Sequence, residues 1–447
     1  MLDYHHSSWW IFALQSGIVK LMFKNYIQNK LEGYVRQYFA AHPEIKLIVV
    51  AGSVGKTSTK TALATVLSQQ YRVRMHPGNH NTELSAPLAI LGIEYPRNIK
   101  SMSAWRQVFK QAKERIAQPA TVDVIIQELG VDKPGDMVVF GRYLRPDIAV
   151  VTAVTPEHME YFGTLDAVAA EELSVVNFSK VGVINRDDIA SKYANLLTNV
   201  SISTYGTTPQ AEYSFVIEDF TVEDGYTGYF TSPELGDRLR AHVHVLGEHS
   251  LRPVSAAVCV AVRFGMNPQA IIRGIESLRP VSGRMNVLKG YNNSMIIDDT
   301  YNASPAAVAS ALATLAAIRA PQKVAILGSM NELGDSTAQA HQAVGQQCQP
   351  SVAEWVITVG QAARQFIAPA ALANGCIVYS FDDAISAGSF VKSKLQPGAV
   401  VLAKGSQGNL YVEEAVKVLL RSSADTSKLV RQDGHWQEIK AHFFSKF

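Results

Sequence analysis

The segment Ala51–Ser58, with the sequence AGSVGKTS, constrains the fold of this chain more than any other part of it. It follows a short apolar run, Lys46–Val50, and leads into Thr57–Ser68, where apolar residues recur at helical spacing. Glycines let the backbone turn tightly and direct N–H groups at an anion, and the positive end of the following helix adds to the same place. The pattern predicts a phosphate-binding loop between a strand and a helix, with a chance glycine-rich turn as the alternative.

The polar residues of this loop have expected roles in binding a nucleotide. Lys56 can reach the β- and γ-phosphates of ATP, and the hydroxyl of Thr57 is placed to bind Mg²⁺. The general form of such a loop also has a glycine where this chain has Val50, so the match to the general pattern is incomplete. The other residues expected to cradle the phosphates are Gly52, Ser53, Gly55 and Ser58.

Further apolar runs alternate with helical segments and predict an α/β protein with two parallel sheets. Between residues 200 and 246 the pattern changes to short alternating runs with turns at Asp224–Gly225 and Gly236–Asp237, which is typical of an antiparallel excursion. We expect a helical segment at 1–43, a central ATPase domain of the phosphate-loop type at 44–281 and a Rossmann-like domain at 282–447. The main strand candidates after Val50 are Val122–Ile126, Ile148–Val154, Val181–Ile184, Met295–Ile297, Val324–Leu327, Trp355–Val359 and Val400–Leu402.

Composition excludes several classes of function. The formal net charge is only +2, from 41 basic and 39 acidic residues, so no field strong enough to indicate nucleic-acid binding is expected. Cys259, Cys348 and Cys376 lack the spacing of a metal site or a disulfide framework, and we expect reduced core thiols in a cytoplasmic protein.

The first residues are apolar but resemble neither a spanning helix nor a secretory signal, because polar residues interrupt the run. The residues that could share one helical face there are Trp9, Trp10, Leu14, Ile18, Leu21 and Met22. We expect this face to pack on the protein body, and contact with a membrane surface is the less favoured alternative.

Several further segments occur in the order in which the Mur ligase family has them. The resemblance covers about residues 46–420 and is nearest the branch that adds D-Ala-D-Ala. It implies an ATP-dependent ligase that activates a carboxylate as an acyl-phosphate and joins D-Ala-D-Ala to a UDP-muropeptide, with ATP and Mg²⁺ as cofactors. The segments are the shortened loop GSVGKTS, His76–Pro87 (HPGNHNTELSAP), Gln127–Gly130, Glu157–Thr164, Val281–Arg284, Ile297–Pro305 (IDDTYNASP), Leu327–Gly334 with His341, and Lys404–Ser406.

The resemblance also implies metal ligands. Thr57, Glu128 and His158 match residues that bind Mg²⁺ in the family; a surface carboxylate and a structural histidine are the alternatives for the last two. Where the family usually has a carbamylated lysine, this chain has Glu172. We expect Glu172 to supply the anionic oxygens directly, with an exposed helical glutamate as the alternative.

Nucleotide and substrate contacts follow from the same resemblance. Lys56, Glu128, His158 and Arg284 are the expected catalytic residues, with Arg284 on the γ-phosphate. Asn185 and His249 are expected near the nucleotide and Asp299 on its ribose, although Ser250 and Pro253 replace two asparagines of the family's adenine motif. The residues expected to contact the donor or the acceptor are Asn79, Asn81, Asn302, Asn331, Glu332, His341 and Lys404.

Two other functions stay open at this point. One is a ligase for another acceptor, of the folylpolyglutamate or poly-γ-glutamate type. The other is a nucleotide-binding partner subunit without catalytic activity, which the two lost asparagines keep open. The segment before the phosphate loop is shorter than the family's UDP-sugar domain, so the donor is expected to bind differently or to be another peptide precursor.

Overall fold

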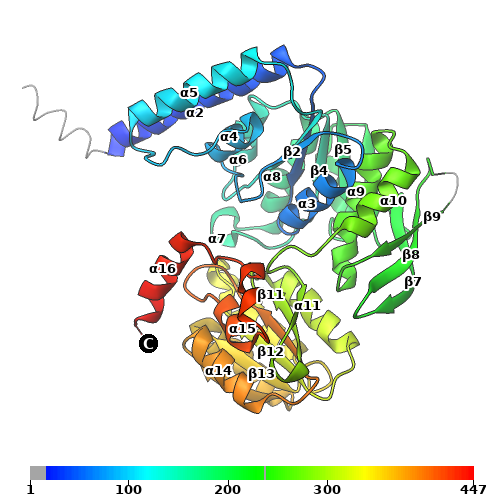
Figure 1. Cartoon of the computed structure of the whole chain (residues 1–447), viewed down its shortest axis with the longest axis vertical. Helices are drawn as coiled ribbons and strands as arrows, with labels where there is room; N and C mark the ends of the chain where they lie inside the picture. Colours follow the sequence, from blue (N-terminus) through cyan, green and yellow to red (C-terminus); the bar gives the residue numbers. More distant parts are fainter. Residues whose placement is uncertain (1–16, 236–237, 447) are drawn as a thin grey trace, which may run out of the picture.

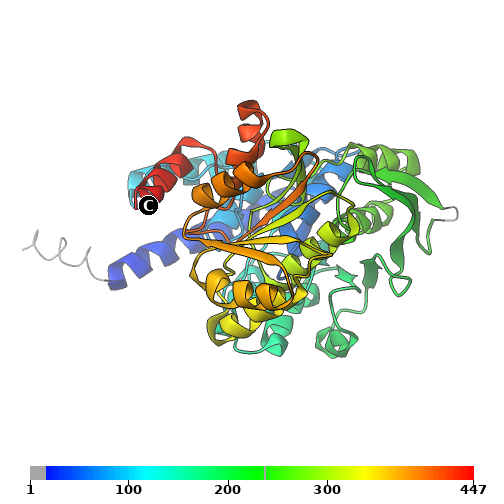
Figure 2. The same cartoon turned by 90° about the horizontal axis from the view of Figure 1, so that it is seen from below.

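The computed structural model describes residues 17–235 and 238–446. The predicted face at Trp9, Trp10 and Leu14, the side chains of Ile18 and Leu21, and the turn at Gly236–Asp237 lie outside what it describes. Two α/β units, stacked in Figure 1, make up the described chain. In Figure 2 the C-terminal unit, coloured yellow to red, lies in front of the N-terminal one.

The first unit contains a nine-stranded sheet in the order β2-β3-β1-β4-β5-β6-β7-β8-β9. Its pairs are parallel from β2 to β7, and β7, β8 and β9 pair antiparallel, which is the excursion that the alternating pattern predicts. The predicted α/β class is confirmed. The strands are β1 (Lys46–Ala51), β2 (Val73–Met75), β3 (Val124–Glu128), β4 (Ile148–Val151), β5 (Val181–Asn185), β6 (Ile202–Gly206), β7 (Tyr213–Thr221), β8 (Gly225–Thr231) and β9 (Leu239–Val243).

Helices cover both faces of this sheet, which explains why β1 is apolar at almost every position. Leu47 and Val49 belong to one core and Ile48 and Val50 to the other, because successive side chains point to opposite faces. The helices of this unit are α2 (Gly17–Ala41), α3 (Lys56–Leu67), α4 (Ser85–Leu91), α5 (Met102–Ala117), α6 (Asp136–Gly141), α7 (Met159–Phe162), α8 (Leu165–Asn177), α9 (Leu251–Arg263) and α10 (Pro268–Ser277), with the 3₁₀ turns η1 (Ser191–Leu196) and η2 (Glu248–Ser250).

The second unit contains a six-stranded sheet in the order β10-β11-β15-β12-β13-β14, parallel except for the pair β10–β11. Ile297 and Ile296 of β11 belong to cores on opposite faces. The strands are β10 (Asn286–Lys289), β11 (Met295–Asp299), β12 (Lys323–Gly328), β13 (Trp355–Val359), β14 (Ile377–Phe381) and β15 (Val400–Lys404). The helical elements are α11 (Pro305–Ala317), α12 (Thr337–Gln347), α13 (Ala368–Ala373), α14 (Ala384–Lys394), α15 (Glu413–Leu419) and α16 (Gly434–Phe444), with η3 (Tyr291–Asn293), η4 (Gly334–Ser336), η5 (Ala363–Ile367) and η6 (Ser423–Lys428).

The helices α2 and α5 lie side by side along one edge of the first unit (Figure 1). Buried Leu31 and Tyr38 of α2 share a core with Trp105 and Ala112 of α5, so α2 packs on the protein body. Over residues 17–235 and 238–446, no helix combines the length and apolarity needed to cross a membrane. The cysteines are free and buried, as expected.

Two helical glycines differ in what an added methyl group would contact, and the difference predicts opposite effects on stability. At Gly33 of α2 the nearest atom, Nη2 of Arg36, would lie 4.0 Å from an added Cβ, whereas at Gly274 of α10 the Cα of Val66 in α3 would lie 2.7 Å away. We expect Gly33→Ala to raise the free energy of unfolding by about 0.5–1 kcal/mol. Gly274→Ala should lower it by about 1–3 kcal/mol, because the clash outweighs the gain in helix propensity. Urea denaturation of the two variants checks this, and a gain at Gly274 would contradict the packing of α10 on α3.

Candidate active site

The backbone of the loop between β1 and α3 requires glycine at two positions. Gly52 has φ 120° and Gly55 has φ 85°, a region that other residues rarely adopt. A Cβ at Gly52 would lie 2.3 Å from Oγ1 of Thr152 and 2.8 Å from the backbone nitrogen of Ala153. The loop therefore rests directly on the end of β4, and α3 begins at Lys56 with Gly55 before it.

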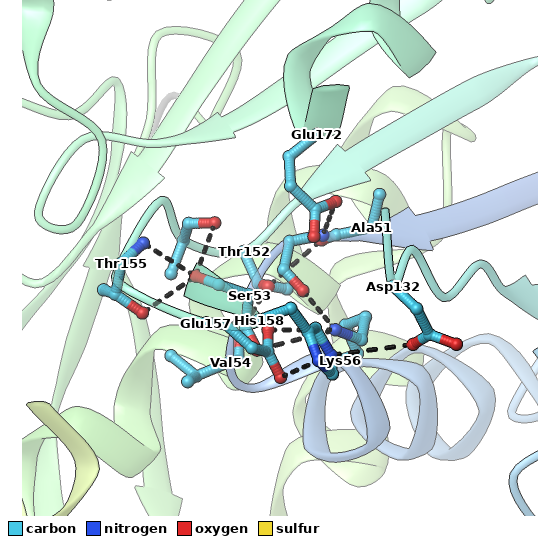
Figure 3. Close-up of polar contacts among 12 residues, drawn as sticks. Ala51, Ser53, Val54, Lys56, Asp132, Thr152, Thr155, Glu157, His158 and Glu172 are labelled. Carbon is cyan, nitrogen blue, oxygen red and sulfur yellow. Dashed lines mark hydrogen bonds and ion pairs between the residues drawn. The ribbon is translucent and has the colours of Figure 1, made fainter. Parts of the chain in front are cut away.

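Hydrogen bonds fix the loop in this place (Figure 3). The backbone N–H of Ser53 donates to the carbonyl of Ala153 at 3.0 Å, and the Ser53 hydroxyl accepts the N–H of Thr155 at 2.8 Å. The hydroxyl of Thr152 donates to the carbonyl of Val54 at 2.6 Å. Residues that follow β4 thus hold the loop before any ligand binds.

The ammonium of Lys56 lies over the loop among acidic side chains. It donates to the carbonyl of Gly52 and is 3.7 Å from a carboxylate oxygen of Glu157. Burial lowers the pKa of Lys56, but the carboxylates of Glu157, Glu172 and Glu128 outweigh it, so the pKa lies above its ordinary value. Lys56 therefore stays a cation at neutral pH, as a group that binds phosphate must.

Glu128, at the end of β3, is the centre of a buried polar cluster. It accepts a hydrogen bond from the Thr57 hydroxyl at 3.1 Å and one from the Asn81 amide at 3.4 Å. The ammonium of Lys60 is 3.3 Å from the same carboxylate and also donates to the carbonyl of Gly78 at 3.1 Å. Thr57 and Glu128 present two hard oxygen donors side by side, which fits Mg²⁺.

Sequence reasoning missed Lys60, although a signal for it exists. It lies one helical turn after Lys56, so both side chains are on the same side of α3.

His158 lies where the two units meet. Its backbone has φ 50° and its ring nitrogens are 3.1 Å from a carboxylate oxygen of Glu332 and 3.6 Å from one of Asp132. Glu157, beside it, contacts both His158 and Lys56. Among the predicted residues, His158 and Glu332 come from opposite sides of the cleft, and the structure brings them into contact.

Glu172 is buried, so it is not the exposed helical glutamate of the alternative reading. Its carboxylate accepts the N–H of Gly52 at 2.7 Å (Figure 3) and does not line the cleft. The part of the chain that the structure describes holds no group of three or more His, Cys, Asp or Glu side chains arranged to hold a metal. In this arrangement Glu172 supports the loop between β1 and α3 through Gly52, and its role as a ligand of Mg²⁺ stays a prediction.

Asn185 and His249, which are predicted to lie near the nucleotide, both line the cleft. The amide of Asn185 donates to the carbonyl of Thr152 and to Asp188, both at 2.7 Å. Burial lowers the pKa of His249 to about 4, so its ring is neutral. Arg252, which precedes the substituted Pro253, lies 3.1 Å from a carboxylate oxygen of Asp188 and so supplies a charged pair in the cleft.

The second unit contributes Arg284 and a buried ion pair. The guanidinium of Arg284 donates to the hydroxyl of Thr57 at 3.3 Å, across the cleft. Lys404 and Asp299 are joined at 2.6 Å, and Lys404 also donates to the carbonyl of Asn302 at 3.0 Å. A residue predicted for ribose and one predicted for the acceptor are therefore partners of each other.

Two other predicted acceptor residues lie outside the main cleft. The amide of Asn331 donates to the carbonyl of Gln407 at 3.0 Å and borders a small neighbouring pocket. His341 is fully buried: its Nδ1 is 2.7 Å from the carbonyl of Thr337, and its Nε2 accepts the N–H of Met330 at 2.8 Å. Both ring nitrogens of His341 are therefore bonded within the protein, and a contact of this residue with the acceptor stays a prediction.

Most of the predicted residues line one cleft of about 900 Å³ between the two units. Residues of both units line this cleft. A ligand bound in it would therefore contact the loop between β1 and α3 and also residues of the second unit. The predicted residues that line it are Ser53, Gly55, Lys56, Thr57, Ser58, Asn79, Asn81, Glu128, His158, Asn185, His249, Arg284, Asp299, Asn302, Glu332 and Lys404.

Comparison with known proteins finds two adjacent family matches. Residues 50–261 match the Mur ligase middle domain, and residues 283–407 match the Mur ligase glutamate ligase domain. The UDP-N-acetylmuramoyl-tripeptide–D-alanyl-D-alanine ligase of Bacillus subtilis is 28% identical over 389 residues, which cover 84% of this chain and 76% of that protein. The Escherichia coli ligase of the same name is 25% identical over 340 residues, covering 74% and 68%.

Solved structures show the same fold. MurF from Acinetobacter baumannii superposes with a TM-score of 0.72 at 21% identity, covering 89% of this chain and 79% of that one. MurF from Thermotoga maritima in complex with ADP superposes with a TM-score of 0.70 at 22% identity, covering 88% and 83%.

The buried carboxyl of Glu172 predicts a pH-dependent difference in stability. Burial raises its pKa from 4.5 to about 7, so the folded protein binds this proton more tightly than the unfolded chain does. Its contribution to stability therefore falls as the pH rises from about 4.5 to about 7 and is constant above that. Glu172→Gln lacks this contribution. The free energy of unfolding of the variant minus that of the native protein should therefore rise by up to about 3 kcal/mol as the pH rises across this window. Urea denaturation between pH 5 and 8 measures the difference, and a flat difference would contradict the assignment.

The ion pair between Lys60 and Glu128 predicts a second effect on the free energy of unfolding. Both side chains are buried, so Lys60→Met leaves a carboxylate without its counter-ion and should lower the free energy of unfolding by about 3–5 kcal/mol. The double variant Lys60→Met/Glu128→Gln should regain most of that loss, because no charge stays buried. Chemical denaturation of the three proteins checks this. A loss below about 1 kcal/mol in Lys60→Met would show that the pair is not formed in solution.

Proposed function

Because the chain belongs to the Mur ligase family, we propose that it uses ATP to join D-Ala-D-Ala to the carboxyl end of a UDP-N-acetylmuramoyl-peptide. The family resemblance seen in the sequence is confirmed by both domain matches. The observation that carries the proposal is the hydrogen bond of 3.3 Å from Arg284 to Thr57. This bond brings a guanidinium of the second unit to the loop that we propose holds the terminal phosphates, so both units would face the phosphoryl group that is transferred.

The residues of the loop fit the triphosphate of ATP. The start of α3, with Gly55 before it, provides the positive end of a helix for an anion, and Lys56 is charged there. Thr57 and Glu128 would hold Mg²⁺, which would neutralise charge on the phosphates.

The proposed reaction has two balanced steps. A carboxylate oxygen of the peptide donor attacks the γ-phosphorus of ATP, and ADP leaves. The amine nitrogen of the acceptor then attacks the acyl carbon, phosphate leaves, and the nitrogen loses a proton. Lys56 and Arg284 stabilise the charge on the transferred group, and the closed cleft keeps water from an acyl-phosphate that it would hydrolyse.

The two substrates are assigned to opposite sides of the cleft. Asn79 and Asn81 lie on the first unit, where we place the donor, and Asn302 and Glu332 lie on the second, where we place the amine. The proposal therefore treats residues 44–281 as the ATP-binding domain and 282–447 as the acceptor-binding domain. Since ATP and UDP-linked precursors are cytoplasmic, the reaction belongs in the cytoplasm.

Phosphate release tests the proposal. With ATP, Mg²⁺ and UDP-N-acetylmuramoyl-tripeptide, we expect D-Ala-D-Ala to stimulate release and to be incorporated into the product, as followed by mass spectrometry. Lys56→Ala should lower the rate by at least about 100-fold, because the transferred phosphoryl group then loses one of its two proposed cationic contacts. Lys113→Ala, at an exposed position of α5, is the matched control and should keep the native rate. Stimulation by L-glutamate alone would assign another acceptor, and binding of ATP without turnover would indicate a non-catalytic subunit.

A further inference from the structure

Arg431 lies beyond residue 407, where the family match ends, and contacts the backbone of Tyr301, a residue that lines the cleft. Arg431 lies between η6 and α16, and its side chain is 6% exposed. Its Nε and Nη2 donate to the two carboxylate oxygens of buried Glu413 at 2.8 and 2.7 Å. Such a bidentate pair fixes the plane of the guanidinium.

The same guanidinium also donates hydrogen bonds to the backbone of the loop that follows β11. Nη2 of Arg431 donates to the carbonyl of Thr300 at 2.7 Å, and Nη1 donates to the carbonyl of Tyr301 at 3.1 Å. The N–H of Tyr301 donates to the carbonyl of Gly283 at 3.0 Å. The backbone of Tyr301 is therefore held on one side by Arg431 and on the other by the residue before Arg284.

The side chain of Tyr301 joins the two units at the phosphate loop. Its hydroxyl accepts a hydrogen bond from the amide of Asn79 in the first unit. The guanidinium of Arg284 lies over its ring, with the central carbon 4.3 Å from the ring centroid. Arg284 in turn donates to Thr57. Tyr301 thus supports Arg284, which reaches the loop between β1 and α3, and its hydroxyl binds Asn79 of the first unit.

We propose that Arg431 and Tyr301 form a latch that closes the two units over the phosphate loop: Arg431 fixes the backbone of Tyr301, and Tyr301 positions Arg284 and captures Asn79. Arg431 is a positioning residue, since it acts only through Tyr301. The effect on turnover rests on the proposed function, whereas the effect on closure does not. Loss of the latch should therefore change the geometry of the cleft even where no reaction is measured.

A neighbouring ion pair supplies the matched control. Lys440 of α16 is 2.5 Å from a carboxylate oxygen of Glu414 and docks the C-terminal segment. It is also 3.6 Å from a carboxylate oxygen of Glu413, but no contact of it with Tyr301 is found in the described chain. Lys440→Met weakens that docking and keeps every hydrogen bond that Arg431 donates to Glu413, Thr300 and Tyr301. If Arg431 only held the C-terminal segment in place, the two variants would behave alike.

The experiment measures closure directly. The three native cysteines are buried, so spin labels can be directed to two cysteines introduced at exposed positions. These are Gln111→Cys on α5 and Ser393→Cys on α14. The distance between the two labels is measured by pulsed electron paramagnetic resonance. The measurement is made on the full chain, with and without a non-hydrolysable ATP analogue. Arg431→Met, Tyr301→Phe and Lys440→Met are compared in this background.

We expect the short, closed distance to dominate in the native protein and in Lys440→Met, and a longer one to gain population in Arg431→Met and, to a smaller degree, in Tyr301→Phe, which loses only the bond to Asn79. Arg431→Met should also lower kcat/KM for ATP by about tenfold or more. Its double variant with Tyr301→Phe should open no further than Arg431→Met alone.

Native closure in both Arg431→Met and Tyr301→Phe, or equal opening in Lys440→Met, would overturn the latch. If Arg431→Met does not fold, Tyr301→Phe alone decides the matter. Opening in the latch variants of a protein that never turns over would support the latch and refute the proposed ligase activity.

Discussion

The site depends on one close approach, that of the backbone at Gly52 to the end of β4. A side chain at position 52 would collide with Thr152, so the loop can lie there only because the residue is glycine. Strands β1 and β4 are parallel neighbours, so the chain that leaves β4 passes directly beside the loop. Thr155, Glu157 and His158 come to the cleft along this path, and their positions follow from the pairing of these two strands.

The electrostatic balance of the cleft follows from the same arrangement. Lys56 and Arg284 line the cleft with Glu128 and Glu157, whereas Lys60 and Glu172 are buried outside its lining, and each cation has an acidic or polar partner. When phosphates are added to such a set, Lys56 can exchange the carbonyl of Gly52 for a phosphate oxygen while it stays charged. The protein keeps its cations in place before the ligand arrives, which reduces the reorganisation that binding requires.

Local sequence signals predicted the loop and the fold class, but they did not predict contacts between residues that are distant in the sequence. The glycine turn, the apolar runs and the spacing of α3 are properties of neighbouring residues, and they predicted the loop and the α/β class. The burial of Glu172, the internal bonds of His341 and the reach of Arg431 depend on which distant segments meet, and no spacing in the sequence reveals that. The pair of Lys60 and Glu128 lies between these cases, since the helical turn after Lys56 signals where Lys60 points but not that β3 ends beside it.

We expect the cleft to transfer the γ-phosphoryl group of ATP to a carboxylate, and an isotope experiment can follow that transfer. The peptide donor is prepared with ¹⁸O in its terminal carboxylate and incubated with ATP and acceptor, and the released phosphate is analysed by mass spectrometry. The phosphate that the amine displaces from an acyl-phosphate carries one oxygen of the original carboxylate, so we expect one ¹⁸O atom in each phosphate. Phosphate released without ¹⁸O, alongside formation of the amide, would contradict it.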